Sequence, residues 1–162
     1  MSATITLPCL SIWQPWAQLI GHGYRLAETR TWALPRKYIG KTLAIAAAKK
    51  LDRDAWIHLC SQYNSNQGRR DAMSRCMGQF GTPDTWPQGC VIGLVHAVGC
   101  ASPNATDSLP PKFRRWAMRD RYTWLFAEAA PLKEPLPVRG KQGIFQVEIP
   151  TNLIPEGVQI HV

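Results

Sequence analysis

The sequence predicts an α+β fold in a single domain. Five or six short apolar or alternating segments are separated by turn residues, and only three stretches have the spacing of an amphipathic helix. Because the strands follow one another with few helices between them, we expect a small, mostly closed mixed β-barrel with flanking helices rather than a doubly wound sheet. The 162 residues match one ordinary domain, which we place at residues 1–150, followed by a C-terminal tail over 151–162.

The predicted strands are runs of branched, apolar or alternating residues bounded by turn residues. They cover residues 7–14, 24–32, 42–47, 90–99, 123–129 and 144–149. Segment 42–47 consists of small and branched residues, which indicates a buried strand. Segment 131–137 contains three prolines and is expected to be an extended connector.

Three helices are expected from capping residues and from apolar positions three and four residues apart. A proline suits the first position of a helix over residues 15–20. Asp52 is expected to cap a helix over residues 52–63. The third helix covers residues 69–77, and Gly78 ends it.

The chain is strongly basic. It has 19 Lys and Arg against 11 Asp and Glu, a formal net charge of +8 and an isoelectric point near 9.6. Such a charge favours a polyanionic partner such as nucleic acid, although a basic surface can also serve solubility alone. Seven tryptophans add to the first interpretation because single strands stack on flat side chains beside cations, but tryptophan is equally a core residue.

The remaining composition argues for a simple intracellular domain. The five cysteines show neither paired spacing nor a C-x-x-C pattern, and the histidines and carboxylates lack metal-ligand spacing. We therefore expect no disulfide, no metal and no cofactor. Because the N-terminus lacks a signal-peptide pattern and no apolar run approaches ~18 residues, we expect a soluble, cytoplasmic protein without a membrane partner. The oligomeric state is left open.

The most informative stretch is residues 23–30, which follow an aromatic run over 11–16. Two-residue periodicity places Glu28 and Arg30 on the same face of a strand. A charged pair on the inner side of a sheet is costly unless it is paired and partly hydrated. The pair therefore indicates either a binding cavity or a surface salt bridge, and spacing alone favours the salt bridge.

This stretch resembles the hallmark of a known family. The pattern G-x-R-x-x-E-x-R is similar to the G-x-K-x-x-E-x-R motif of the ASCH family (activating signal cointegrator homology), a branch of the PUA-like superfamily. Its positions are Gly23, Arg25, Glu28 and Arg30. Further blocks resemble other segments of the family, namely residues 10–17, 45–49, 86–93 and 137–145. The resemblance implies a PUA-like β-barrel with a cleft beside the first helix.

The resemblance also implies nucleic-acid binding, and some members are described as ribonucleases or as amidohydrolases acting on acylated cytidine. The amidohydrolase pattern has a Lys and a Thr three residues apart, where this sequence has Arg25 and Glu28. A guanidinium, with a pKa above about 12, cannot act as nucleophile or base, and Glu28 supplies no hydroxyl. The amidohydrolase interpretation is therefore the weaker one.

The leading interpretation is a binding module for RNA or single-stranded DNA, in which bases stack on indoles while cations hold phosphates or base edges. The residues expected to bind are Trp13, Gln14, Arg25, Arg30, Trp32, Lys49, Trp86 and Lys141. The alternative is a hydrolase acting on RNA or on a modified nucleoside, with Glu28 and Lys49 as catalytic residues. A protein-interaction domain for an acidic partner is a third interpretation.

Overall fold

The computed structural model describes residues 2–162 and contains one mixed sheet of six strands. The strands are β1 (Thr4–Gln14), β2 (Ala27–Arg30), β3 (Thr42–Leu51), β4 (Cys90–Ala101), β5 (Tyr122–Pro137) and β6 (Ile144–Pro150). Their order is β2-β5-β4-β3-β1-β6, in which β1 and β3 run parallel and the other neighbours antiparallel. The predicted α+β class is confirmed.

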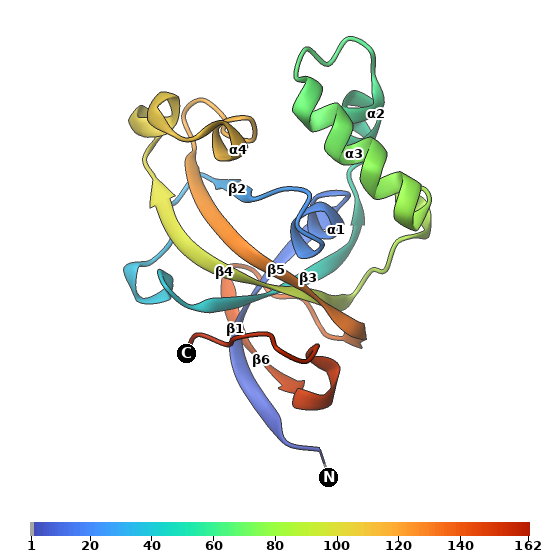
Figure 1. Ribbon diagram of the computed structural model, residues 1–162, viewed down its shortest axis with the longest axis vertical. Helices are drawn as coiled ribbons and strands as arrows, with labels where there is room; N and C mark the ends of the chain where they lie inside the picture. Colours follow the sequence, from blue (N-terminus) through green and yellow to red (C-terminus); the bar gives the residue numbers. More distant parts are fainter. Residues whose placement is uncertain (1) are drawn as a thin grey trace.

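The sheet curves strongly, as Figure 1 shows, but it does not close. Its edge strands are β2 and β6, and within residues 2–162 they are not paired with each other. β2 has only four residues, and among the strands of residues 2–162 it pairs with β5 alone. The predicted barrel is therefore not confirmed, and the observed structure is an open, curved sheet.

Helices cover one half of the molecule. They are α1 (Trp16–Gly21), α2 (Arg53–Cys60), α3 (Gln67–Phe80) and α4 (Pro111–Arg114). Short 3-10 helices are η1 (Arg36–Tyr38), η2 (Pro83–Thr85), η3 (Pro103–Ser108) and η4 (Thr151–Leu153). Figure 1 shows all four α-helices in the same half, whereas β6 and both termini lie in the other. Of the helices within residues 2–162, none is long and apolar enough to cross a membrane.

α2 and α3 each begin at a residue whose side chain caps the helix. Asp52 accepts a hydrogen bond from the backbone N–H of Ala55 at 2.9 Å, which confirms the predicted start of α2. α2 ends at Cys60 rather than near residue 63. The side chain of Asn66 then accepts from the N–H of Arg69 at 3.1 Å and begins α3.

Alternate residues of β3 enter two different cores, because successive side chains of a strand point to opposite faces. Leu43 and Ile45 belong to the core that includes Ile20 of α1. Ala44 and Ala46 belong to the core on the other face, with side chains of β6. A third core joins α1 to α3 and contains buried Leu19, Met73, Trp86 and Trp116. Residues 42–47 of β3 are buried, with side chains in cores on both faces, and this confirms the buried strand that their composition predicted.

β5 is longer than the sequence predicted. The proline-containing segment 131–137 pairs with the first residues of β4, so the prediction of an extended connector there is wrong. Pro135 falls in the irregular stretch where the register shifts between Val91 and Gly93, and Pro137 is the last residue of the strand. Proline cannot donate a ladder hydrogen bond, and these two positions tolerate that loss.

The C-terminal tail folds back onto the sheet. The N–H of Thr42 donates to the backbone carbonyl of His161 at 2.8 Å, and the N–H of His161 donates to Thr42 Oγ1 at 2.9 Å. Ile154 and Ile160 pack against the second core. The tail is therefore anchored to the start of β3 by both hydrogen bonds and apolar contacts.

Candidate functional site

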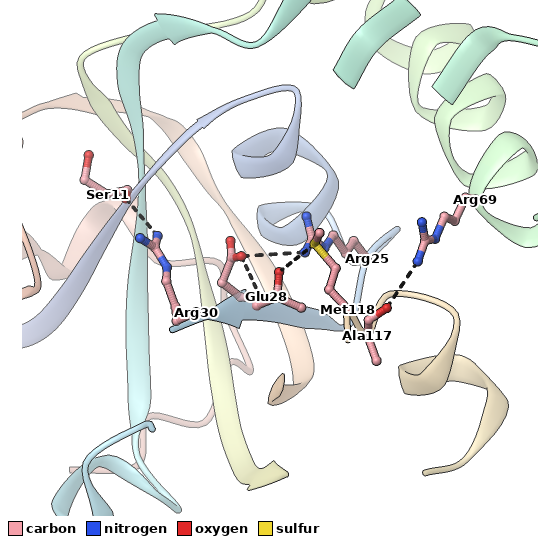
Figure 2. Close-up of polar contacts among 8 residues, drawn as sticks. Ser11, Arg25, Glu28, Arg30, Arg69, Ala117 and Met118 are labelled. Atoms are coloured by element: carbon pink, nitrogen blue, oxygen red, sulfur yellow. Dashed lines mark hydrogen bonds and ion pairs between the residues drawn. The ribbon is translucent and has the colours of Figure 1, made fainter. Parts of the chain in front are cut away.

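The motif residues Arg25 and Glu28 form a buried ion pair. Arg25 Nη2 lies 3.6 Å from Glu28 Oε1, and the two residues are 4% and 6% exposed. Burial lowers the pKa of the Arg25 guanidinium from its ordinary value, an effect that the charge of Glu28 opposes. Figure 2 shows the two side chains facing each other beneath α1. The pair lies inside the protein rather than on its surface.

Both partners are held by further contacts. The guanidinium of Arg25 packs on the rings of Trp16 in α1 and Trp116 after α4, at 4.5 and 5.4 Å from the ring centroids. Glu28 Oε1 also accepts the backbone N–H of Thr29 at 2.6 Å. Because these contacts join α1, β2 and the segment after α4, the pair serves to hold the motif in place.

Arg69 strengthens the same junction from α3. It packs against the ring of Trp116 at 5.8 Å, and its Nη2 donates to the carbonyl of Ala117 at 3.4 Å. Its Nε donates to the carbonyl of Arg115. Burial lowers the pKa of the Arg69 guanidinium from its ordinary value. The hydrogen bond from Arg69 to Ala117 is visible at the right of Figure 2, on the far side of Arg25 from Arg30.

Arg30 lies apart from this ion pair and lines a cleft. Its Nη2 lies 3.4 Å from the carbonyl oxygen of Ser11 on β1, as Figure 2 shows. Glu28 makes its ion pair with Arg25 instead. Glu28 and Arg30 therefore form neither a pair in a binding cavity nor a surface salt bridge, because the carboxylate of Glu28 is buried against Arg25.

The cleft has a volume of about 1220 Å³ and lies along β1, β3 and the loop over residues 138–143. Its charged and aromatic lining residues are Trp13, Arg30, Trp32, Lys49, Arg139 and Lys141. Among the residues that line it there is no Asp, Glu or His. Four cations without a neighbouring carboxylate in the lining give the cleft a positive potential suited to an anion.

Two exposed indoles form part of the cleft wall. Trp13 is 46% exposed, and the ammonium of Lys50 lies 3.7 Å from the centroid of its ring. Trp32 is 36% exposed and packs edge-on against the buried Trp124, whose Nε1 donates to the carbonyl of Trp32 at 3.1 Å. The two rings are thus held in place while part of each remains open to solvent.

Glycine is required where Lys49 crosses the floor of the cleft. Gly89 has a φ of +67°, and a Cβ at this position would lie 2.7 Å from Cε of Lys49. The stem of Lys49 therefore packs directly over the backbone of Gly89. This contact fixes the path of the lysine along the cleft.

The structure brings together five of the predicted binding residues, namely Trp13, Arg30, Trp32, Lys49 and Lys141. The other three lie elsewhere. Arg25 is buried in its ion pair with Glu28. Gln14 is buried and donates to the carbonyl of Pro87 at 2.9 Å, and the indole of buried Trp86 donates to the carbonyl of Gly81 at 3.0 Å. None of these three side chains lines the cleft. Of the two predicted catalytic residues, Lys49 lines the cleft and Glu28 does not.

Sequence reasoning missed Arg139, Gln142 and Ser11, which also line the cleft. Arg139 and Gln142 flank Lys141 in one loop, so the local density of polar side chains was the available signal. Ser11 contributes its backbone carbonyl to Arg30, a role that side-chain chemistry does not reveal.

Comparison with known proteins identifies the family. A family model of the ASCH domain matches residues 10–136, most of the chain, and the protein belongs to the ASCH domain family. This family is generally linked to RNA binding. The chain is similar to activating signal cointegrator 1 of Homo sapiens, at 31% identity over 94 residues, and of Mus musculus, at 29%. Those matches cover 58% of this chain but only 14% of either relative.

Among solved structures, the fold is similar to the crystal structure of ASCH from Zymomonas mobilis. The TM-score is 0.49 at 14% identity, and the likeness covers 86% of each chain. The assignment to the ASCH family rests on the match of residues 10–136 to the family model.

Proposed function

We propose that the cleft binds single-stranded nucleic acid, with RNA as the first candidate. One observation carries the proposal: four cations and two exposed indoles converge on a single cleft that has no carboxylate in its lining. Cations can hold the phosphates of a single strand while bases stack on the indoles, each stacked base contributing roughly 1–3 kcal/mol.

The dimensions of the cleft favour a polymer over a small metabolite. Its volume of about 1220 Å³ exceeds the ~300–1,000 Å³ that is usual for small-molecule pockets. Its four lining cations come from three elements: Arg30 at the end of β2, Lys49 on β3, and both Arg139 and Lys141 on the loop before β6. This spread suits successive phosphates of a strand better than one compact anion.

A hydrolase function receives less support from the same geometry. Glu28, the expected general acid or base, is paired with Arg25 and lies outside the cleft lining. Lys49 is the one predicted catalytic residue that a bound strand would meet. A cleft that offers cations and rings but no carboxylate or imidazole is better suited to holding a strand than to moving protons along it.

Fluorescence anisotropy with a short labelled single-stranded RNA tests the proposal. If all four cleft cations contact phosphates, the slope of log affinity against log salt is about −2.8, from roughly −0.7 for each single-strand phosphate contact. Lys141→Gln should weaken binding and make the slope less negative. Lys112→Gln, which removes an exposed charge on α4, is the matched control and should leave both unchanged.

Isolated nucleosides separate nucleic-acid binding from binding of an acidic protein. A cleft that stacks bases should perturb the fluorescence of Trp13 or Trp32 on addition of a nucleoside in large excess. Strand binding that is equal for wild type and Lys141→Gln at every salt concentration would reject the proposed site. Binding of a polyanion such as heparin without any nucleoside response would favour the acidic-protein interpretation instead.

A further inference from the structure

A second cluster of chemically reactive side chains lies outside the cleft. His96 on β4, Glu128 on β5 and His161 in the C-terminal tail bring one ligand atom each to within 4.8 Å of the others. None of the three lines the cleft. Glu128 Oε2 lies 3.3 Å from Nε2 of His161 and 3.7 Å from Nδ1 of His96. One carboxylate oxygen thus faces a nitrogen of each imidazole.

Sheet register and a bulge place the first two side chains. His96 is opposite Ala127 on β5, whereas Leu94 is opposite Ala130, so β5 has one extra residue across this interval. Glu128 lies in that bulge with a φ of +53°, a conformation that non-glycine residues seldom adopt. Because a bulge re-aims the side chain that it contains, it turns the carboxylate toward His96.

The third side chain is delivered by the tail. On the neighbouring strand, Thr42 is opposite His96. The two hydrogen bonds between the backbone of His161 and Thr42 hold the tail at this point. The imidazole of His161 then stacks on that of His96, with centroids 4.0 Å apart and planes 14° from parallel. Three separate elements therefore converge on one point of the surface.

The separations match those between ligands of a small metal ion. A tetrahedral ion bound at about 2.0–2.2 Å has ligands roughly 3.3–3.6 Å apart. The two nitrogen–oxygen distances, 3.3 and 3.7 Å, lie at or next to that range. Because the rings are nearly parallel, one imidazole must rotate about its terminal torsion to point its lone pair at the ion, and that torsion is broad.

We propose that His96, Glu128 and His161 form a binding site for a divalent transition-metal ion of the zinc type. Two imidazoles and one carboxylate are the ligands that Zn²⁺, Co²⁺ and Ni²⁺ share, whereas Ca²⁺ and Mg²⁺ prefer oxygen alone. The side chain of Glu128 is 61% exposed, so the ion keeps at least one position open to water or to a further ligand. Bound metal would fasten the C-terminal tail to β4 and β5.

Zinc titration of the chelator-treated protein by calorimetry tests the proposal, with a reductant present so that the cysteines stay as thiols. Wild type should bind one equivalent. Glu128→Gln preserves shape and removes the charged ligand, and it should weaken binding at least about tenfold. His58→Ala, which removes an exposed histidine of α2, is the matched control and should bind like wild type.

A second variant and a spectrum distinguish loss of a ligand from loss of the fold. The backbone of His161 keeps both hydrogen bonds to Thr42 in His161→Ala, so this variant should remain folded yet lose at least about tenfold in affinity. Visible spectra with Co²⁺ should show nitrogen and oxygen ligation. Absence of zinc binding in wild type, a thiolate-type cobalt spectrum, or an equal loss in His58→Ala would overturn the site.

Discussion

Arg25 and Arg30 stand five positions apart in one motif, yet their surroundings are opposite. Arg25 is buried between Trp16 and Trp116 and is paired with Glu28. Arg30 lines the cleft, and the only hydrogen bond of its side chain within residues 2–162 goes to the carbonyl of Ser11. A buried charge without a partner is expensive, whereas a charge beside solvent is not.

This contrast divides the motif into a structural part and a part available to a ligand. Arg25 stands where the family motif has Lys, and arginine suits the structural part of the motif. Its planar guanidinium can stack between two indoles and pair with a carboxylate at the same time. Arg30 meets no carboxylate among the residues that line the cleft. Variants should therefore lose either stability or binding, according to the part that they change.

The largest effect is expected from Glu28→Gln, which keeps the acceptor for the Thr29 N–H but leaves Arg25 without its counter-charge. Breaking a buried pair in this way should lower the free energy of unfolding by about 3–5 kcal/mol. Urea denaturation followed by tryptophan fluorescence measures the loss. Glu148→Gln, at an exposed position of β6, should change it by less than about 0.5 kcal/mol. Equal stabilities for the two variants would contradict a structural ion pair.

Trp13→Ala should have the reverse effect. Loss of one stacking surface should weaken RNA binding by roughly 1–3 kcal/mol, about 5- to 150-fold. Because Trp13 is 46% exposed, the free energy of unfolding should change little. Anisotropy and urea denaturation on the same preparation measure both quantities. A loss of stability without a loss of affinity would place Trp13 with the structural residues.

Gly89→Ala should couple the two properties. The left-handed φ of +67° makes any side chain costly there, by about 1–2 kcal/mol, and the new Cβ would displace Lys49 from the cleft floor. Stability and RNA affinity should therefore both fall. Gly157→Ala also has a positive φ but nothing within 4 Å of the added Cβ, so it should lower stability alone. Unchanged RNA affinity in Gly89→Ala would exclude Lys49 from binding.

The smallest effect is expected from Arg30→Gln. Loss of one phosphate contact should make the slope of log affinity against log salt less negative by about 0.7 and leave the free energy of unfolding nearly unchanged. A salt series of anisotropy titrations measures the change. A slope equal to that of wild type, together with reduced stability, would assign Arg30 to the same structural role as Arg25.

Strand positions were predictable where local pattern and burial agree. Segment 42–47 has small and branched side chains because both of its faces pack in cores, and the structure has β3 there. Segment 131–137 was wrongly predicted to be a connector because it contains prolines. In the structure it belongs to β5, where irregular pairing and the strand end accommodate the prolines. Closure of the sheet depends on which edges meet, and local sequence contains no signal for that.

The sequence predicted that the site would contain cations and indoles, but it did not predict which of these side chains reach the cleft. Trp13 and Trp86 look alike in sequence, yet only Trp86 finds carbonyls for its indole N–H inside the protein. Gln14 is polar but buried because Pro87, 73 positions away, accepts its amide. His161 meets Glu128 across 33 positions, so no ligand spacing revealed that cluster.

The division of the motif is tested most directly by following the seven tryptophan indole N–H signals in NMR spectra while single-stranded RNA is added. The indoles of Trp13 and Trp32 should shift, because they border the cleft. Those of Trp16 and Trp116, which enclose Arg25, should stay in place. Shifts at Trp16 and Trp116, with Trp13 and Trp32 unmoved, would show that RNA meets the buried pair instead and would contradict the account.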